Sequence, residues 1–190
     1  LVTTTTDQWK ITEGWLAAAR RAPSPNCNPR PEGAVTELIV IHGISLPPGE
    51  YGGPEIEALF TNTLDADAHP YFAEIAGLEV SAHFLIRRAG EMVQFVSTDM
   101  RAWHAGVSCW QGREQCNDFS IGIELEGCDD EAYTDAQYDT LNELLAALTK
   151  HYPDIRHDAI VGHSDIAPGR KTDPGPAFDW SRVVAGQSEQ

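Results

Sequence analysis

Apolar runs recur along the chain between polar and turn-forming segments, and their pattern predicts a β-sheet. Residues 38–41 are apolar at all positions and mostly β-branched, which is typical of a central strand buried on both faces. Residues 119–126 alternate instead, so that Glu124 projects from the face opposite the apolar one. We also expect strands at 81–87, 92–96 and 159–161, the first two joined by a turn at 89–91.

Two further segments carry the pattern of a helix. Residues 54–60 begin with Pro54, which suits the first helical position, and place apolar residues on one face. Thr134 and Gln137 have the spacing of a capping box, and leucines then recur at helical spacing up to Tyr152. Strands interspersed with helices predict a mixed α/β fold with a central mixed β-sheet flanked by α-helices.

Three segments show little regular structure in the sequence. Residues 11–30, rich in proline towards their end, predict an extended coil lying on the body. Residues 45–76 read as turns apart from the short helix, and a long irregular insertion of this kind is often functional. Residues 161–176 combine proline and glycine with a histidine, two aspartates and a lysine, which is typical of a catalytic or metal-binding loop.

Length and composition limit the possible classes of protein. A chain of 190 residues fits one domain, so we expect a single domain over 1–190, with a flexible lead-in at 1–13 and a flexible tail at 184–190. The formal net charge of −16 excludes a basic cluster for nucleic acid or an anionic membrane. The longest apolar runs are far below the roughly 20 residues that span a bilayer. We expect a monomer.

The cysteines and the first residues favour a cytoplasmic location. Four cysteines occur without a C-x-x-C pair, and we expect mostly reduced, buried thiols, as in a cytosolic protein. Residues 1–9 show neither the basic nor the apolar region of a signal peptide.

Two histidines and nearby carboxylates suggest a metal site. His42 and His163 each follow a short apolar segment, and either Asp165 or Asp173 can supply an acidic ligand. Two histidines and a carboxylate form a standard ligand set for hydrolytic zinc, with a position left open for water. The spacing does not choose between the two aspartates. A single histidine at a strand end is more often structural than a ligand.

An iron site of the facial-triad type is the competing metal interpretation. The run from His163 to Asp165 imitates half of such a triad, but its second histidine usually lies downstream and no histidine follows His163. The alternatives for the other candidates are structural: Glu124 as an exposed strand carboxylate and Lys171 as a surface cation.

Several segments together resemble the AmpD type of N-acetylmuramoyl-L-alanine amidase, within the superfamily that also contains the peptidoglycan recognition proteins. The resemblance covers residues 14–180, and its matching segments occur in the same order as in that family. These segments are residues 40–50, 101–106, 119–127, 162–168 and 171–176. The family consists of cytoplasmic zinc enzymes that process 1,6-anhydro-muropeptides during cell-wall recycling. The resemblance therefore implies an amidase whose small-molecule substrate is an anhydro-muropeptide, with neither nucleic acid nor membrane as partner.

The resemblance also implies roles for individual residues. Zn²⁺ would bind His42, His163 and Asp173 at one edge of the sheet, with Glu124 and Lys171 as the catalytic pair. One position departs from the family pattern, because Gly43 stands where an asparagine is expected. A peptide contact made by that asparagine would be missing here.

Substrate-binding residues are predicted less directly. Trp103 is a candidate platform for the anhydro sugar. Arg113 is one of four arginines, with Arg87, Arg88 and Arg101, that are available for the carboxylates of the peptide. The remaining histidines are interpreted as structural or surface residues; they are His69, His83, His104, His151 and His157.

Two other functions remain open for a chain of this type. One is a peptidoglycan-binding module of the same fold that has lost catalysis, which the presence of all five metal and catalytic candidates disfavours. The other is a secreted amidase that acts on intact peptidoglycan.

Overall fold

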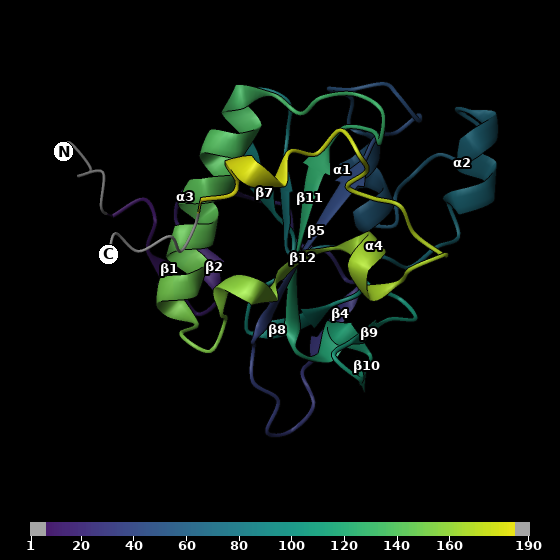
Figure 1. Cartoon of the computed structure of the whole chain (residues 1–190). Helices are drawn as coiled ribbons and strands as arrows, with labels where there is room; N and C mark the ends of the chain where they lie inside the picture. The colour runs from purple at the N-terminus through teal and green to yellow at the C-terminus, as the bar shows by residue number, and fades with distance from the viewer. Residues whose placement is uncertain (1–6, 185–190) are drawn as a thin grey trace.

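A six-stranded mixed sheet forms the centre of the molecule in the computed structural model, which describes residues 7–184 (Figure 1). The strands lie in the order β12 (Ile160–Gly162), β5 (Leu38–Ile44), β11 (Ser120–Glu126), β6 (Phe84–Ile86), β7 (Met92–Gln94) and β3 (Arg20–Arg21). Neighbouring strands are parallel except for the antiparallel pair β6–β7. The mixed α/β architecture is confirmed.

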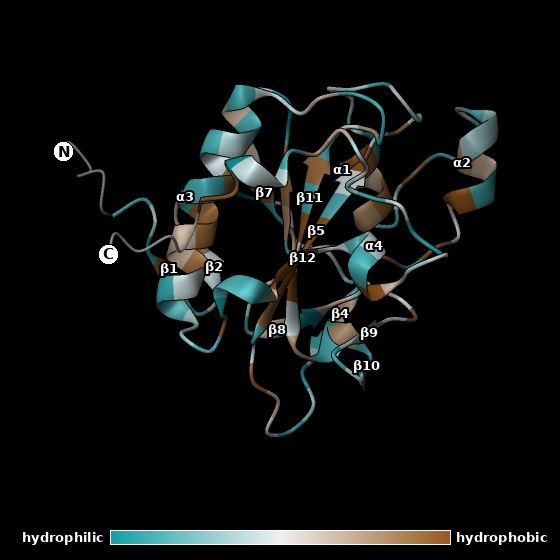
Figure 2. Cartoon of the chain, in the orientation of Figure 1, coloured by the Kyte–Doolittle hydropathy of each residue, from teal (hydrophilic) through white to brown (hydrophobic). Residues whose placement is uncertain are grey.

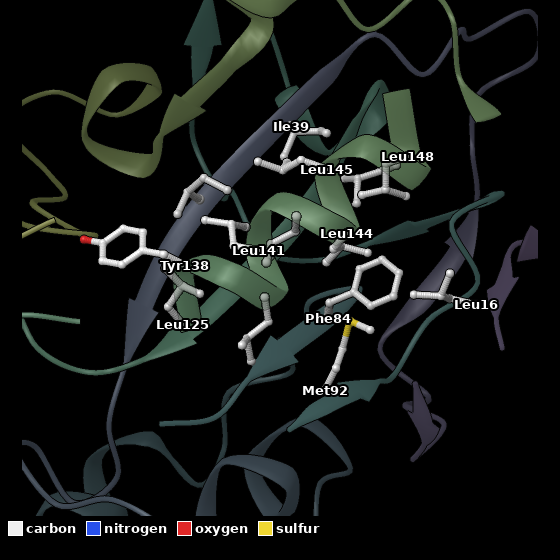
Figure 3. Close-up of a cluster of buried hydrophobic side chains, with 14 of the residues drawn as sticks. Leu16, Ile39, Phe84, Met92, Leu125, Tyr138, Leu141, Leu144, Leu145 and Leu148 are labelled. Carbon is white, nitrogen blue, oxygen red and sulfur yellow. The ribbon is translucent and has the colours of Figure 1, made fainter. Parts of the chain in front are cut away.

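The long helix α3 (Asp135–His151) covers one face of the sheet. It begins with the predicted capping box, in which the Thr134 hydroxyl accepts from the Gln137 N–H and the Gln137 side chain accepts from the Thr134 N–H. Its apolar stripe, including Leu141 and Leu144, packs against Ile39 and Phe84 of the sheet (Figure 3). This burial holds the sheet rigid beneath the site.

The opposite face of the sheet carries a second apolar cluster. Helix α1 (Glu55–Phe60) contributes Phe60, which packs edge-on against Phe95 with ring centroids 5.0 Å apart. Helix α2 (Pro70–Ile75) adds Phe72 to the same cluster. Hydrophobic residues therefore concentrate along the central strands (Figure 2), and both faces of the sheet are covered.

Several local predictions differ from the structure. Residues 11–30 are not merely coil, because they contain β1 (Ile11–Thr12), β2 (Trp15–Leu16), β3 and β4 (Cys27–Pro29), of which β3 joins the main sheet beside β7. β4 pairs with β8 (Met100–Ala102). These pairings are long-range, so two- or three-residue strands leave little local signal.

Two short helices were also not predicted. α2 begins at Pro70, which suits the first turn of a helix. The preceding His69 caps the helix, because its side chain accepts from the Tyr71 N–H. α4 (His163–Ile166) interrupts the loop at 161–176. The remaining elements are β9 (Cys109–Trp110), β10 (Arg113–Glu114) and the 3₁₀ turns η1 (Cys116–Asp118), η2 (His157–Ala159) and η3 (Trp180–Arg182).

The other expectations about the whole chain have mixed outcomes. All four cysteines are free, but only Cys116 is buried, so the expectation of mostly buried thiols is wrong. Within residues 7–184, no helix is long and apolar enough to cross a membrane. Residues 1–6 of the lead-in and 185–190 of the tail lie outside the described residues, and the single-domain organisation stays a prediction.

Candidate active site

The register of two parallel strands places Glu124 directly beside His42. β5 and β11 pair over seven positions, with Glu124 opposite His42. Side chains alternate along a strand, so these two residues face away from α3, while Ile41 and Ile123 face towards it. His42 therefore lies inside a strand that continues to Ile44, and not at the end of one.

The loop after β12 supplies the other candidate ligands. β12 runs parallel to β5, so His163, at the start of α4, lies close to His42. The Ser164 N–H donates to the Asp173 carbonyl at 3.0 Å and ties the two ends of the loop together. Asp165 instead accepts from the Gly162 N–H at 2.7 Å. Its carboxylate is engaged locally, which leaves Asp173 to face the histidines.

The three candidate ligands converge with spacings suited to a metal. The Nδ1 atoms of His42 and His163 are 3.0 Å apart, and Asp173 oxygens lie 3.3 Å and 3.2 Å from them. Metal–ligand distances of 2.0–2.1 Å in a tetrahedral zinc site imply ligand atoms about 3.3 Å apart. Each of the three residues offers one ligand atom, and these atoms all lie within 4.8 Å of one another. The residues present therefore fit a zinc-sized cation.

A backbone carbonyl determines which nitrogen of His163 faces the site. His163 Nε2 lies 3.0 Å from the Ala105 carbonyl, which can only accept a hydrogen bond. The proton therefore sits on Nε2, and Nδ1 presents a lone pair towards His42 and Asp173. Histidines that ligate metals commonly have this kind of outer hydrogen bond.

His104 supports His42 in the same way, although the sequence predicts only a structural or surface role for it. Its Nδ1 lies 2.8 Å from His42 Nε2, and its Nε2 lies 3.0 Å from the Ser120 hydroxyl. A metal on His42 Nδ1 requires His42 Nε2 to donate to His104. The spacing of histidines along the sequence gives no signal for this contact, because His42 and His104 come from separate elements of the fold.

Gly122 and Asn117 fix the position of His104. A Cβ at Gly122 would lie 2.4 Å from His104 Cγ, so only glycine leaves room for the ring. The Asn117 side-chain oxygen accepts from the backbone N–H of His104 at 3.1 Å and of Ala105 at 2.8 Å. Asn117 thus positions both His104, which contacts His42, and the Ala105 carbonyl, which contacts His163.

Burial and neighbouring charges set the protonation of the site. Burial lowers the pKa of His42 to about 4, which favours the neutral form that ligates metals. Burial, reinforced by the Asp173 charge, raises the pKa of Glu124 well above its usual value. Burial also opposes ionisation of Asp173, but the hydrogen bonds and charges of His163 and His42 hold its pKa well below the usual range.

An open cavity of about 420 Å³ adjoins these residues. The metal candidates, Glu124, Lys171 and Trp103 all line it. Glu124 Oε2 is buried and has no hydrogen-bond partner within the described part of the chain, and Lys171 is exposed. The Trp103 indole N–H donates to Asn28, which leaves the ring at the cavity wall.

Arg113 lies away from this cavity. It extends from β10, forms an ion pair with Glu37 and stacks over the Phe119 ring at 3.8 Å. It is not among the residues that line the cavity. Its assignment to the substrate stays a prediction from the sequence.

A mixed sheet that brings two histidines, a carboxylate and a buried glutamate to one cavity is the arrangement of a metal-dependent hydrolase. The family model for N-acetylmuramoyl-L-alanine amidase matches residues 32–176. The chain belongs to this amidase family.

Individual relatives cover almost the whole chain. The 1,6-anhydro-N-acetylmuramyl-L-alanine amidase AmpD of Escherichia coli is 64% identical over 90% of this chain and 93% of its own. AmpD of Haemophilus influenzae is 52% identical, over 92% of this chain and 95% of its own. A crystal structure of a selenomethionine derivative of AmpD superposes with a TM-score of 0.90 at 63% identity and covers 93% of this chain and 98% of its own.

A more distant structure contains a substrate. It is the complex of the amidase AmiD of E. coli with anhydro-N-acetylmuramic acid-L-Ala-D-γ-Glu-L-Lys. Its TM-score is 0.58 at 29% identity, over 81% of this chain and 59% of that chain.

Proposed function

We propose that this protein hydrolyses the amide between N-acetyl-anhydromuramic acid and L-alanine in soluble muropeptides, with zinc as cofactor. The convergence of His42, His163 and Asp173 beside Glu124 carries the proposal. The near full-length similarity to AmpD proteins supports the choice of substrate. The role is then cell-wall recycling, and the cytoplasmic location stays a prediction that rests on the family resemblance.

The ligand chemistry favours zinc over other ions. Two imidazoles and one carboxylate form a hydrolytic zinc set with an open fourth position. Zinc bound there supplies Lewis-acid polarisation of the scissile carbonyl and lowers the pKa of water to about 7. Harder ions such as magnesium prefer sites made of oxygen ligands.

Glu124 is placed to transfer protons. Its Oε1 lies 4.0 Å from His42 Nδ1, so the carboxylate borders the position where the nucleophilic water must bind. Among the described residues, Oε2 is buried and has no hydrogen-bond partner, so the ionised carboxylate can take a proton from that water. The same carboxyl group then donates the proton to the departing alanine nitrogen.

Lys171 is placed to stabilise negative charge. It lines the cavity two residues before Asp173, and its ammonium makes no hydrogen bond to any other described residue. A free cation at this position can approach the carbonyl oxygen as that oxygen gains charge. Loss of one such donor typically costs about 100- to 1,000-fold in kcat.

The intact set of five residues favours an enzyme over a binding module. A module that has lost catalysis has no need of an unpartnered buried carboxyl group at the metal position. The choice between soluble fragments and intact peptidoglycan rests on the AmpD relatives, whose names specify the anhydro form.

The test combines metal content with activity. The zinc-loaded protein is incubated with the anhydro-muropeptide and, separately, with whole cell-wall sacculi, and released peptide is measured. We expect one zinc per chain and release from the soluble fragment only. Release from sacculi at a similar rate would assign the protein to intact peptidoglycan, and no release from either would refute the amidase function.

Two variants separate metal binding from chemistry. Glu124→Gln should keep zinc and lose activity by about 100-fold or more, because it removes proton transfer. His163→Ala should lose both the zinc and the activity. The matched control is Glu114→Gln, which removes an exposed carboxylate on β10 and should leave both unchanged. A fully active Glu124→Gln protein would remove this residue from the mechanism.

A further inference from the structure

The cavity beside the metal candidates is almost devoid of cations. Lys171 is the only lysine or arginine among the residues that line it, in a chain whose arginines and lysines all lie within the described residues 7–184. The four arginines considered for peptide carboxylates are engaged elsewhere: Arg87 with Glu57 and Glu126, Arg88 with Glu131, Arg101 with Asp118, and Arg113 with Glu37.

The wall on the α2 side of the cavity is apolar. Six residues form it: Leu46, Leu59, Tyr71, Ile75, Leu78 and Val80. Leu78 is 50% exposed and Tyr71 is 36% exposed. Large apolar side chains exposed at the rim of a cavity indicate a contact surface for a ligand. α2 lies at the periphery of the molecule, on the side opposite α3 (Figure 1).

Among residues 7–184, Asp129 is the only acidic group in the cavity lining besides Glu124 and the candidate ligand Asp173. Its backbone carbonyl accepts from the Ala177 N–H at 3.0 Å, and its carboxylate accepts from the Thr172 hydroxyl. These contacts anchor Asp129 to the loop that carries Lys171 and Asp173. Beyond the reaction centre, the fixed charge that meets a substrate is therefore negative.

The peptide in the AmiD complex shows what this charge would meet. In L-Ala-D-γ-Glu-L-Lys, the γ-linkage leaves the α-carboxylate of glutamate free, and lysine adds an amino group and a terminal carboxylate. An arginine that pairs with such a carboxylate usually does so with two hydrogen bonds. No arginine lines the cavity here. The net charge of −16 further disfavours ligands rich in carboxylates.

We propose that this enzyme selects muropeptides by an amino group on the peptide stem, with Asp129 as the specificity-determining residue and the apolar wall on the α2 side as the contact for the stem. Peptide carboxylates are not recognised by ion pairs. The inference rests on the proposed amidase function, because it concerns the substrate of the same site.

Three substrates test the inference on the zinc-loaded enzyme. They are anhydro-N-acetylmuramic acid-L-Ala-D-γ-Glu-L-Lys, the same compound with the glutamate α-carboxylate converted to a carboxamide, and the same compound with the lysine amino group acetylated. We expect the carboxamide to keep kcat/KM within about threefold or to raise it. Acetylation should lower kcat/KM about threefold to fivefold, the range of a partly exposed ion pair.

A pair of variants assigns the preference to Asp129. In Asp129→Asn the effect of acetylation should shrink to less than about twofold, whereas in Asp130→Asn it should persist. Asp130 is exposed, adjacent and outside the cavity lining, so it is a matched control for charge. The readout is a ratio between two substrates, which a general loss of stability or activity does not change.

Two outcomes would overturn the inference. A loss of about 10-fold or more on amidation in the unmodified enzyme would mean that a cation recognises the carboxylate. An acetylation effect that persists in Asp129→Asn would remove Asp129 from specificity. Calorimetric binding to the zinc-loaded protein of the tripeptide with its alanine nitrogen acetylated, and of its two derivatives capped in the same way, gives the same comparison without turnover. Failure of the amidase function would therefore be distinguishable from failure of this inference.

Discussion

His104 shows how a residue outside the candidate ligand set can support a proposed metal site. Its ring lies 2.8 Å from His42, is seated over Gly122 and is held by the backbone contacts of Asn117. An outer partner of this kind orients the ligand and keeps its lone pair directed at the metal. The contribution of His104 is therefore measurable as metal affinity.

We predict that His104→Leu lowers zinc affinity about 10- to 100-fold, because His42 loses its acceptor. His104→Gln, whose amide oxygen can accept from His42, should recover part of the loss. Competition with a chelating dye measures the affinity. His157→Leu, at an exposed histidine in η2, is the control and should leave affinity unchanged. Equal affinity in the His104 and His157 variants would contradict the supporting role.

Gly43 has a local explanation in Tyr133. A Cβ at position 43 would lie 2.3 Å from the Tyr133 hydroxyl, which donates to the Pro174 carbonyl at 2.9 Å. The tyrosine hydroxyl thus occupies the space in which a side chain at position 43 would begin. The departure from the family pattern is coupled to the loop that carries Asp173.

We predict that Gly43→Ala lowers the free energy of unfolding by about 1–3 kcal/mol through overpacking. In a Tyr133→Phe background the same substitution should cost less, because the hydroxyl that it meets is gone. Urea denaturation of the four proteins in the cycle measures the coupling. Gly77→Ala, where a Cβ meets nothing within 4 Å, should have little effect. Strict additivity of the two substitutions would refute the coupling.

At the scale of elements, the pairing of β5 with β11 forms half of the site. Seven aligned positions put Glu124 beside His42, and a shift of one residue would turn Glu124 towards the apolar layer under α3. The leucines of α3 pack on that layer and so hold the register. Helix α3 therefore supports the site although none of its residues lines the cavity.

The start of α3 provides a test at this scale. Thr134→Ala removes the capping hydroxyl, which also donates to the Arg88 carbonyl at 2.6 Å. We expect a loss of about 0.5–2 kcal/mol in the free energy of unfolding. Thr149→Ala makes the same chemical change inside the helix, where the hydroxyl donates to the Leu145 carbonyl, and it should be nearly neutral. Similar losses in both variants would argue against a special role for the cap.

For the whole molecule, we expect the extensive core and the proposed zinc to contribute separately to stability. Apolar clusters cover both faces of the sheet, so the fold does not depend on an ion in the way that a small zinc module does. Bound zinc should nevertheless add stability, because it binds only the folded arrangement of His42, His163 and Asp173.

We predict that a chelator lowers the melting temperature without unfolding the protein at room temperature. Free zinc at 100 times its Kd stabilises the folded state by about 2.7 kcal/mol. Calorimetry with and without chelator measures the shift, and circular dichroism checks that the fold persists. His163→Ala should show no shift. An identical melting temperature with and without chelator in the unaltered protein would contradict a structural contribution of the metal.

The amino-acid sequence by itself determined the elements whose signals are local. The capping box and leucine spacing of α3, the buried run at 38–41, the alternation at 119–126 and the hairpin between β6 and β7 all follow from neighbouring residues. The residues also suggested His42, His163 and one of two aspartates as metal ligands. The family resemblance then selected Asp173 and gave roles to Glu124 and Lys171, and the structure brings all five to one cavity.

Only the tertiary structure decided which residues meet across the chain. It engaged Asp165 at Gly162, placed His104 behind His42, paired the short strands of residues 11–30 and left the cavity without an arginine. The physical reason is that these contacts join residues far apart in sequence. They depend on strand order and register, which local periodicity does not encode.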